Sequence, residues 1–184
     1  PPDVSYLLNP QNACYQACST LAGLQHTTTR FAIKFRSDEY YTELGGVLER
    51  LHRDPFRILS GSVYFRRDAQ HKFHCGDHII AGDRQILTRG FRRVLTTCET
   101  MLPITAGNLQ PLPEQLITRG LLLAKGEQPL LANSRELMMR HFAPLSLQMF
   151  GKFSCRLHVH KKGQVSRDYI YEDDRNKINS TGKC

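Results

Sequence analysis

The chain has 184 residues, of which 40% are hydrophobic and 23% charged, and this balance excludes a long disordered polypeptide. Its 25 Lys and Arg outnumber its 17 Asp and Glu, which gives a formal net charge of +8 and favours a polyanionic partner: nucleic acid, an acidic membrane face or an acidic protein. No apolar run approaches the roughly 20 residues that cross a bilayer, so no transmembrane segment is expected.

The basic residues are scattered, and this bears on the kind of partner. The densest clusters, at 89–93 and 160–162, are not interleaved with the several aromatic side chains that a nucleic-acid stacking surface uses. A protein substrate or protein partner, acidic in character, is therefore favoured, and nucleic acid is a less favoured alternative. The basic excess also fits a surface that only keeps the protein soluble.

The pattern along the chain predicts an α+β fold, with one domain over residues 1–174 and a loose tail at 175–184. An N-terminal helix is expected over residues 13–24, where apolar residues recur every three or four positions and Asn12 precedes them as a cap.

A strand and a second helix are expected next. Residues 27–36 alternate strictly between apolar and basic side chains, which predicts a half-buried strand. A helix over 38–53 is expected behind a Ser37 cap, because its acidic residues precede its basic ones, as the helix dipole prefers.

The remaining segments complete the predicted fold. Short β-type runs over residues 56–97 predict central antiparallel β segments, separated by glycine-containing turns. Helical patterns return at about 113–124 and 134–142. A C-terminal β-hairpin is expected over residues 152–173, with its turn at Lys-Lys-Gly-Gln.

Six cysteines are compatible with three disulfides in 15 pairings, or with free thiols. Cys14 follows the expected cap by two residues, where unpaired backbone N–H groups and the helix dipole stabilise a thiolate. Cys18 lies one turn further on and is expected to be buried. A disulfide between the two would distort the helix, so none is expected.

The expected hairpin carries a second set of polar side chains. His158 and His160 fall on the polar face of its first strand, and the return strand ends with Asp173 and Asp174. A histidine beside a carboxylate is the arrangement that orients and charges an imidazole in nucleophilic hydrolases. Alternatively, these histidines face solvent and have no role.

The order of these residues resembles the papain-like cysteine hydrolases. The stretch "NACYQAC" looks most like the helix of their compact bacterial effector members, which include peptidases and glutamine deamidases. The resemblance implies that Cys14 is the nucleophile and that His158 or His160 is the general base. It further implies that Asp173 or Asp174 is the orienting carboxylate and that Gln11 is the oxyanion-hole side chain.

A second group of candidate ligands lies within "HKFHCGDHII". His71, His74, Cys75 and His78 are potential zinc ligands, and Asp77 could orient one of them. All four lie within eight residues, whereas a structural zinc site draws its ligands from separate segments, so an edge strand and a turn are expected instead. Phosphate-binding, dinucleotide-binding and metalloprotease motifs are missing, so no cofactor and no metal are expected.

Three functions follow from these patterns. The first is a thiol hydrolase acting on an amide bond, as a protease or a glutamine deamidase of the toxin or effector kind. The second is a secreted, disulfide-stabilised binding domain with a basic partner surface, which a bonded Cys184 would suit. The third is a basic ribonuclease-like toxin that uses His158 and His160 as acid and base. Compartment is undetermined, with secretion or delivery into a host cell favoured.

Overall fold

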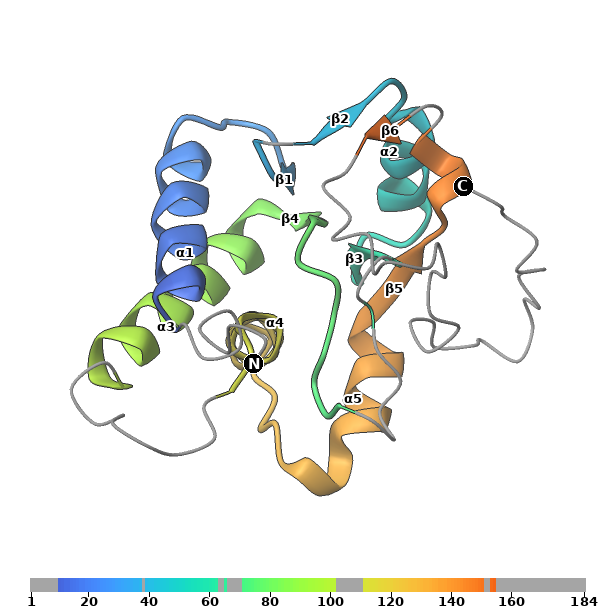
Figure 1. Cartoon of the computed structure of the whole chain (residues 1–184). Coiled ribbons are helices and arrows are strands. Elements are labelled where there is room, and N and C mark those ends of the chain that lie inside the picture. Colours follow the sequence, from blue (N-terminus) through green and yellow to red (C-terminus); the bar gives the residue numbers. More distant parts are fainter. Residues whose placement is uncertain are drawn as a thin grey trace, which may run out of the picture.

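The computed structural model shows a mixed α+β fold in which helices cover a four-stranded sheet (Figure 1). Within the described ranges, no helix combines the length and the apolarity that crossing a bilayer requires. The structure describes residues 10–37, 39–62, 65, 71–101, 111–150 and 153–154.

The sheet has the strand order β1-β4-β3-β5. Its antiparallel part joins β1 to β4 and β4 to β3, and its one parallel pair joins β3 to β5. A separate two-stranded sheet joins β2 to β6. The six strands are β1 (Phe31–Phe35), β2 (Tyr40–Tyr41), β3 (Ile58–Gly61), β4 (Ile79–Asp83), β5 (Phe142–Leu145) and β6 (Phe153–Ser154).

Helices cover both faces of the larger sheet. The longest, α1 (Pro10–Gln25), α3 (Arg84–Met101) and α4 (Pro113–Ala124), pack together on one face. The other face is covered by α2 (Gly45–Arg53) and by the 3-10 turn at Leu147–Phe150. One short helix, α5 (Ser134–His141), precedes β5.

Both faces of the sheet are therefore buried, and side chains alternate between two apolar cores. On β4, Ile80 belongs to the core beneath α1, α3 and α4, whereas its neighbours Ile79 and Ala81 belong to the core beneath α2. The long buried run of β3 and β4 is explained by this double coverage.

Two glycines allow α3 and α4 to approach closely. A Cβ atom on Gly120 would lie 2.6 Å from Val94 Cγ2 and 2.8 Å from the carbonyl oxygen of Gly90. A Cβ atom on Gly90 would in turn lie 2.6 Å from Leu121 Cδ2. The two helices thus meet backbone against backbone at this point.

The expected helices at 113–124 and 134–142 are confirmed, as is the N-terminal helix. The β-type interpretation of the segment after Asp83 is wrong, because residues 84–101 form α3. Its buried residues recur every three or four positions, as on one face of a helix, and they are Leu87, Phe91, Val94 and Cys98. The helix expected over 38–53 begins only at Gly45, after β2.

The alternating strand is present as β1, but its basic side is partly covered by α1. Ala32 is buried beneath the three-helix layer, and the neighbouring Lys34 points to the same side of the strand. The apolar Phe31 and Ile33 pack against the other core. Of the expected C-terminal hairpin, only β6 lies within the described residues, and the expected tail lies outside them.

Candidate functional site

Cys14 lies further into its helix than the cap at Asn12 implied. The helix begins at Pro10, which makes Cys14 its fifth residue. The unpaired N–H groups belong to the first four residues, and the effect of the dipole declines within the first turn. The expectation that the end of the helix activates this thiol directly is therefore weakened by the structure.

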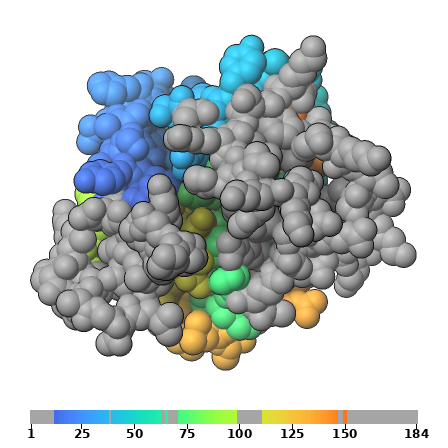
Figure 2. Space-filling view, viewed as in Figure 1, coloured from blue at the N-terminus to red at the C-terminus, as the bar shows by residue number. Residues whose placement is uncertain are grey.

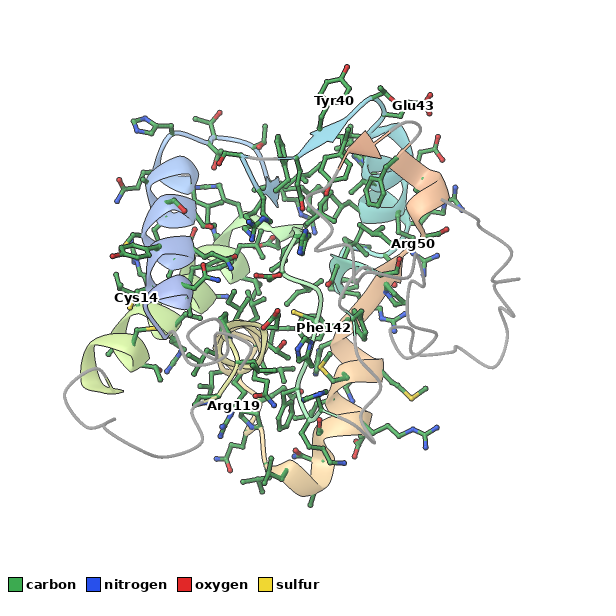
Figure 3. All side chains as sticks on the ribbon, viewed as in Figure 1. Cys14, Tyr40, Glu43, Arg50, Arg119 and Phe142 are labelled. Atoms are coloured by element: carbon green, nitrogen blue, oxygen red, sulfur yellow. The ribbon has the colours of Figure 1, made fainter. Side chains whose placement is uncertain are left out.

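The side chain of Cys14 is half-buried where α1 runs beside α3 (Figure 3). It packs against the core that contains Cys98 of α3, and the two cysteines are near each other without forming a disulfide. None of the four cysteines in the described ranges forms a disulfide with another of them, and the bridged framework stays a prediction.

Cys18 corrects a second expectation, because it is exposed rather than buried. Four residues advance a helix by about 40° beyond one full turn. That rotation carries Cys18 away from the buried stripe formed by Ala13, Ala17 and Leu24. Cys18 is therefore the more exposed of the two thiols, whereas the sequence predicted that it would be buried.

The structure describes only part of the predicted catalytic group. Gln11 lies one turn before Cys14 in the backbone of α1. The other predicted members lie outside the described residues, and they are His158, His160, Asp173 and Asp174. Their arrangement around Cys14 stays a prediction.

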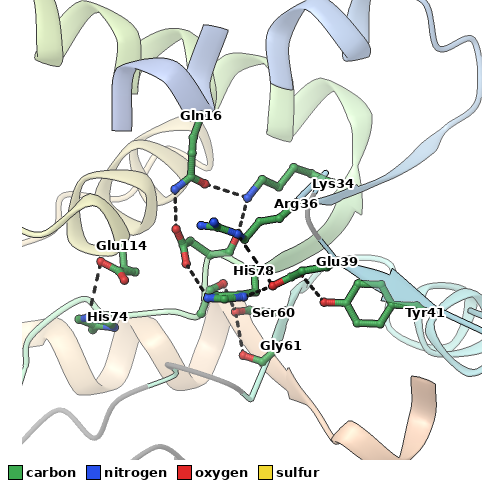
Figure 4. Close-up of polar contacts among 12 residues, drawn as sticks. Gln16, Lys34, Arg36, Glu39, Tyr41, Ser60, Gly61, His74, His78 and Glu114 are labelled. Atoms are coloured by element: carbon green, nitrogen blue, oxygen red, sulfur yellow. Dashed lines mark hydrogen bonds and ion pairs between the residues drawn. The ribbon is translucent and has the colours of Figure 1, made fainter. Parts of the chain in front are cut away.

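A partly buried polar cluster, which the sequence pattern did not indicate, joins α1 to the sheet (Figure 4). Lys34 Nζ donates to Gln16 Oε1 at 2.8 Å and to the carbonyl oxygen of Asp77. Gln16 Nε2 donates to Asp77 Oδ2 at 2.5 Å. Burial lowers the pKa of Lys34 below that of an ordinary lysine, and the negative charge of Asp77 opposes this shift.

The second half of the cluster surrounds Glu39, a buried carboxylate between β1 and β2. Its carboxylate accepts hydrogen bonds from Tyr41 Oη at 2.6 Å and from His78 Nδ1. Arg36 Nε lies 3.9 Å from the same carboxylate. His78 Nε2 lies 4.0 Å from Asp77 Oδ1, so the imidazole stands between two carboxylates.

This cluster does not supply partners to Cys14. Two residues along a helix correspond to a rotation of about 200°, so Cys14 and Gln16 lie on opposite flanks of the buried stripe of α1. Gln16 faces β1 and Asp77, whereas Cys14 packs on the side of α3. The cluster instead fastens α1, β1 and the segment before β4 to one another.

The histidine-rich segment before β4 is a buried connection, which corrects the expected edge strand. It is held by hydrogen bonds from Phe73 N to Ser134 Oγ at 2.9 Å and from Cys75 N to Thr118 Oγ1 at 3.1 Å. Burial raises the pKa of the Cys75 thiol to about 12, which keeps it protonated near neutral pH. A neutral, inaccessible thiol is not a nucleophile.

The residues that the sequence offers as candidate zinc ligands have separate partners in the structure. His78 is bound to Glu39, while His74 Nε2 lies 3.8 Å from Glu114 Oε2 of α4. Across the part of the chain that the structure describes, no group of three or more His, Cys, Asp or Glu side chains could hold a metal ion.

A scan of the chain against family models finds no match, and neither do searches of curated proteins and solved structures. The papain-like resemblance therefore stays a hypothesis about residue order. Function is therefore inferred from the chain's own thiols, carboxylates and imidazoles.

Proposed function

We propose that this chain is a thiol hydrolase that acts on amide bonds, with Cys14 as its nucleophile. The observation that supports the proposal best is the state of Cys14, which is partly accessible, held on a helix of 16 residues and not disulfide-bonded to another described cysteine. Gln11 precedes it by about one turn of the helix, and the resemblance assigns its side chain to the oxyanion hole. The papain-like resemblance assigns the remaining roles.

The proposed hydrolysis has two steps, formation of a thioester and its hydrolysis by water. The Cys14 thiolate attacks the amide carbonyl carbon, the C–N bond breaks, and the amine leaves with the proton that His158 or His160 has taken from the thiol. Water then attacks the thioester, giving the carboxylic acid and the free thiol. Asp173 or Asp174 would hold the imidazole in the correct orientation during both steps.

Cys18 provides a matched control for the reactivity of Cys14, because the two thiols share one helix. Without activation, alkylation by iodoacetamide follows exposure, and the exposed Cys18 reacts before the half-buried Cys14. With a histidine partner, Cys14 reacts faster than Cys18 at pH 6, where unassisted thiols are almost entirely protonated. Peptide mass spectrometry after timed alkylation measures both rates, and a faster Cys18 would contradict the proposal.

Activity gives the second test. Purified protein is incubated with a peptide library and with glutamine-containing peptides, and both new amino termini and released ammonia are measured. Cys14→Ala is expected to abolish the product, whereas Cys18→Ala is expected to retain it within about twofold, since an exposed surface substitution rarely changes a site. New amino termini indicate a protease, and ammonia indicates a deamidase.

The two alternative functions give different results in the same material. A non-reducing thiol count of zero would favour the disulfide-stabilised binding domain. Degradation of RNA that is lost in His158→Ala and His160→Ala, but kept in Cys14→Ala, would favour the ribonuclease-like toxin.

A further inference from the structure

The first strand of the sheet, β1, is an edge strand with an open side. It pairs only with β4, and no strand in the described ranges pairs with its other side. An open edge presents a row of backbone donors and acceptors to a further strand.

The register of β1 and β4 identifies which backbone groups face outward. Arg84 N donates to Arg30 O at 2.8 Å, and these two residues continue the register that pairs Phe31 with Asp83. In an antiparallel pair, hydrogen-bonded and non-hydrogen-bonded residues alternate. The backbone groups of Ile33 and Phe35 therefore point away from β4.

The open edge lies along a groove between β1 and α1. The groove has a volume of about 1000 Å³ and is lined by every residue from 31 to 37. Since side chains of a strand alternate between its faces, a continuous lining means that the groove follows the edge rather than one face. Figure 2 shows α1 and the segment that follows it side by side at the surface of the molecule.

Two exposed aromatic side chains stand at this groove. Tyr15 on α1 is 69% exposed and Phe35 on β1 is 48% exposed, and both line it. Large exposed aromatics beside a groove are the side chains that most often anchor protein partners.

The charged side chains among the described residues that line the groove are both basic. Lys34 and Arg36 line it, and among the described residues that do so none is acidic. Among the described residues, Asp77 and Glu39 interact with these two cations, and they are only 4% and 8% exposed. With a chain charge of +8, the groove complements an acidic ligand.

We propose that an extended acidic peptide segment of a partner protein binds this groove by adding a strand to the open edge of β1. The main-chain groups of Ile33 and Phe35 bond the peptide backbone, and Tyr15 and Phe35 contact its apolar side chains. A strand of five residues spans about 17 Å, which sets the contact at five or six peptide residues. The site lies on the flank of α1 opposite to Cys14, so the inference does not depend on the thiol chemistry.

A matched pair of substitutions separates the backbone bond from the side chain. Phe35→Ala removes the aromatic ring but keeps the N–H group, whereas Phe35→Pro removes both. Proline is tolerated on an edge strand where its nitrogen faces outward, so pairing with β4 is retained. Binding of a fluorescein-labelled (Glu-Val)3 peptide to the full chain is measured by anisotropy, with circular dichroism as the check on folding.

Phe35→Pro is expected to bind the peptide roughly 3- to 10-fold more weakly than Phe35→Ala, the effect of one lost hydrogen bond. The corresponding (Lys-Val)3 peptide is expected not to bind. Equal affinity of the two variants, equal binding of the lysine peptide, or no binding by the wild-type chain would each overturn the proposal.

Amide hydrogen exchange tests the same inference on the wild-type chain. It therefore gives a result even if the Phe35→Pro variant fails to fold. In the free protein the amides of Ile33 and Phe35 should exchange faster than those of Ala32 and Lys34, which are bonded to β4. Saturating (Glu-Val)3 should slow the first pair and leave the second pair unchanged. Unchanged exchange at Ile33 and Phe35 would overturn the proposal.

Discussion

Lys34 shows how a single side chain changes its role with its surroundings. In the sequence it belongs to the basic side of an alternating strand, yet α1 packs over that side and leaves the lysine only partly exposed. Its ammonium group keeps two hydrogen-bond acceptors, Gln16 Oε1 and the carbonyl oxygen of Asp77. The cost of burying the charge is reflected in the lowered pKa of Lys34.

This predicts a specific pH dependence of stability. The pKa of Lys34 is lower in the folded chain than its value of 10.5 in the unfolded chain. Between these two pKa values the unfolded chain binds more protons than the folded chain, so the free energy of unfolding rises with pH there. Lys34→Met removes this contribution and should flatten the rise. Urea unfolding of both chains at several pH values between 7 and 10 measures the difference, and parallel pH profiles would contradict the interpretation.

Lys34→Met should also lower stability at pH 7. It leaves the amide oxygen of Gln16 and the Asp77 carbonyl without their buried donor, which costs about 1–3 kcal/mol. The substitution Arg53→Met, on an exposed ion pair with Glu49, is the matched control and should cost less than about 1 kcal/mol.

Cys75 is buried and Cys18 is exposed, and this difference predicts different rates of alkylation. The pKa of the buried Cys75 thiol is raised to about 12 by desolvation, so it stays protonated even at pH 9. It should resist iodoacetamide at that pH until the chain is unfolded, whereas the exposed Cys18 should be modified at once. Alkylation with and without urea, read by mass spectrometry, checks this, and modification of Cys75 in the folded protein would exclude its burial.

At the scale of elements, the contact between α3 and α4 depends on two glycines. Gly120→Ala places a Cβ atom 2.8 Å from the carbonyl oxygen of Gly90, where the backbone cannot move aside cheaply. Overpacking of this kind costs about 1–3 kcal/mol.

Gly23 provides the matched control for Gly120. It lies in α1 with no atom within 4 Å of an added Cβ, so Gly23→Ala should instead stabilise the protein by about 0.5–1 kcal/mol. Chemical denaturation compares the two variants. A neutral Gly120→Ala would mean that α3 and α4 are further apart than the structure places them.

At the scale of the whole molecule, the end of the described chain completes a sheet begun by its first half. The parallel strand β5 pairs with β3, and β6 pairs with β2. Without β5, the buried strand β3 would become an unprotected edge.

Truncation tests this dependence. A chain that ends at residue 141 lacks β5 and should fail to unfold cooperatively. A chain that ends at residue 174 lacks only the tail expected from the sequence, and should keep the melting temperature of the full chain within about 2 °C, since an unattached tail contributes little stability. Circular dichroism during heating compares the three chains, and a cooperative transition of the shorter one would show that β5 is dispensable.

The α+β class and the helices at 113–124 and 134–141 were predictable from the sequence, because periodicity and capping act over a few residues. The segment 84–101 was misassigned, although Leu87, Phe91 and Val94 have helical spacing, because its short apolar runs also suit strands. The local pattern there admitted two conformations, and packing against α1 and α4 selects the helix.

The sequence by itself determined that α1 carries two thiols and that β1 alternates between apolar and basic side chains. Only the tertiary structure decided which thiol is covered, which core each side of β1 faces and which edge of the sheet has no further strand among the described residues. All three depend on the direction from which α1 packs on the sheet. That direction is set by contacts between residues far apart in the chain, such as Gln16 and Asp77, which are separated by 61 positions. Local propensity acts along the chain and carries no information about such distant neighbours, whereas burial is set by all of them together.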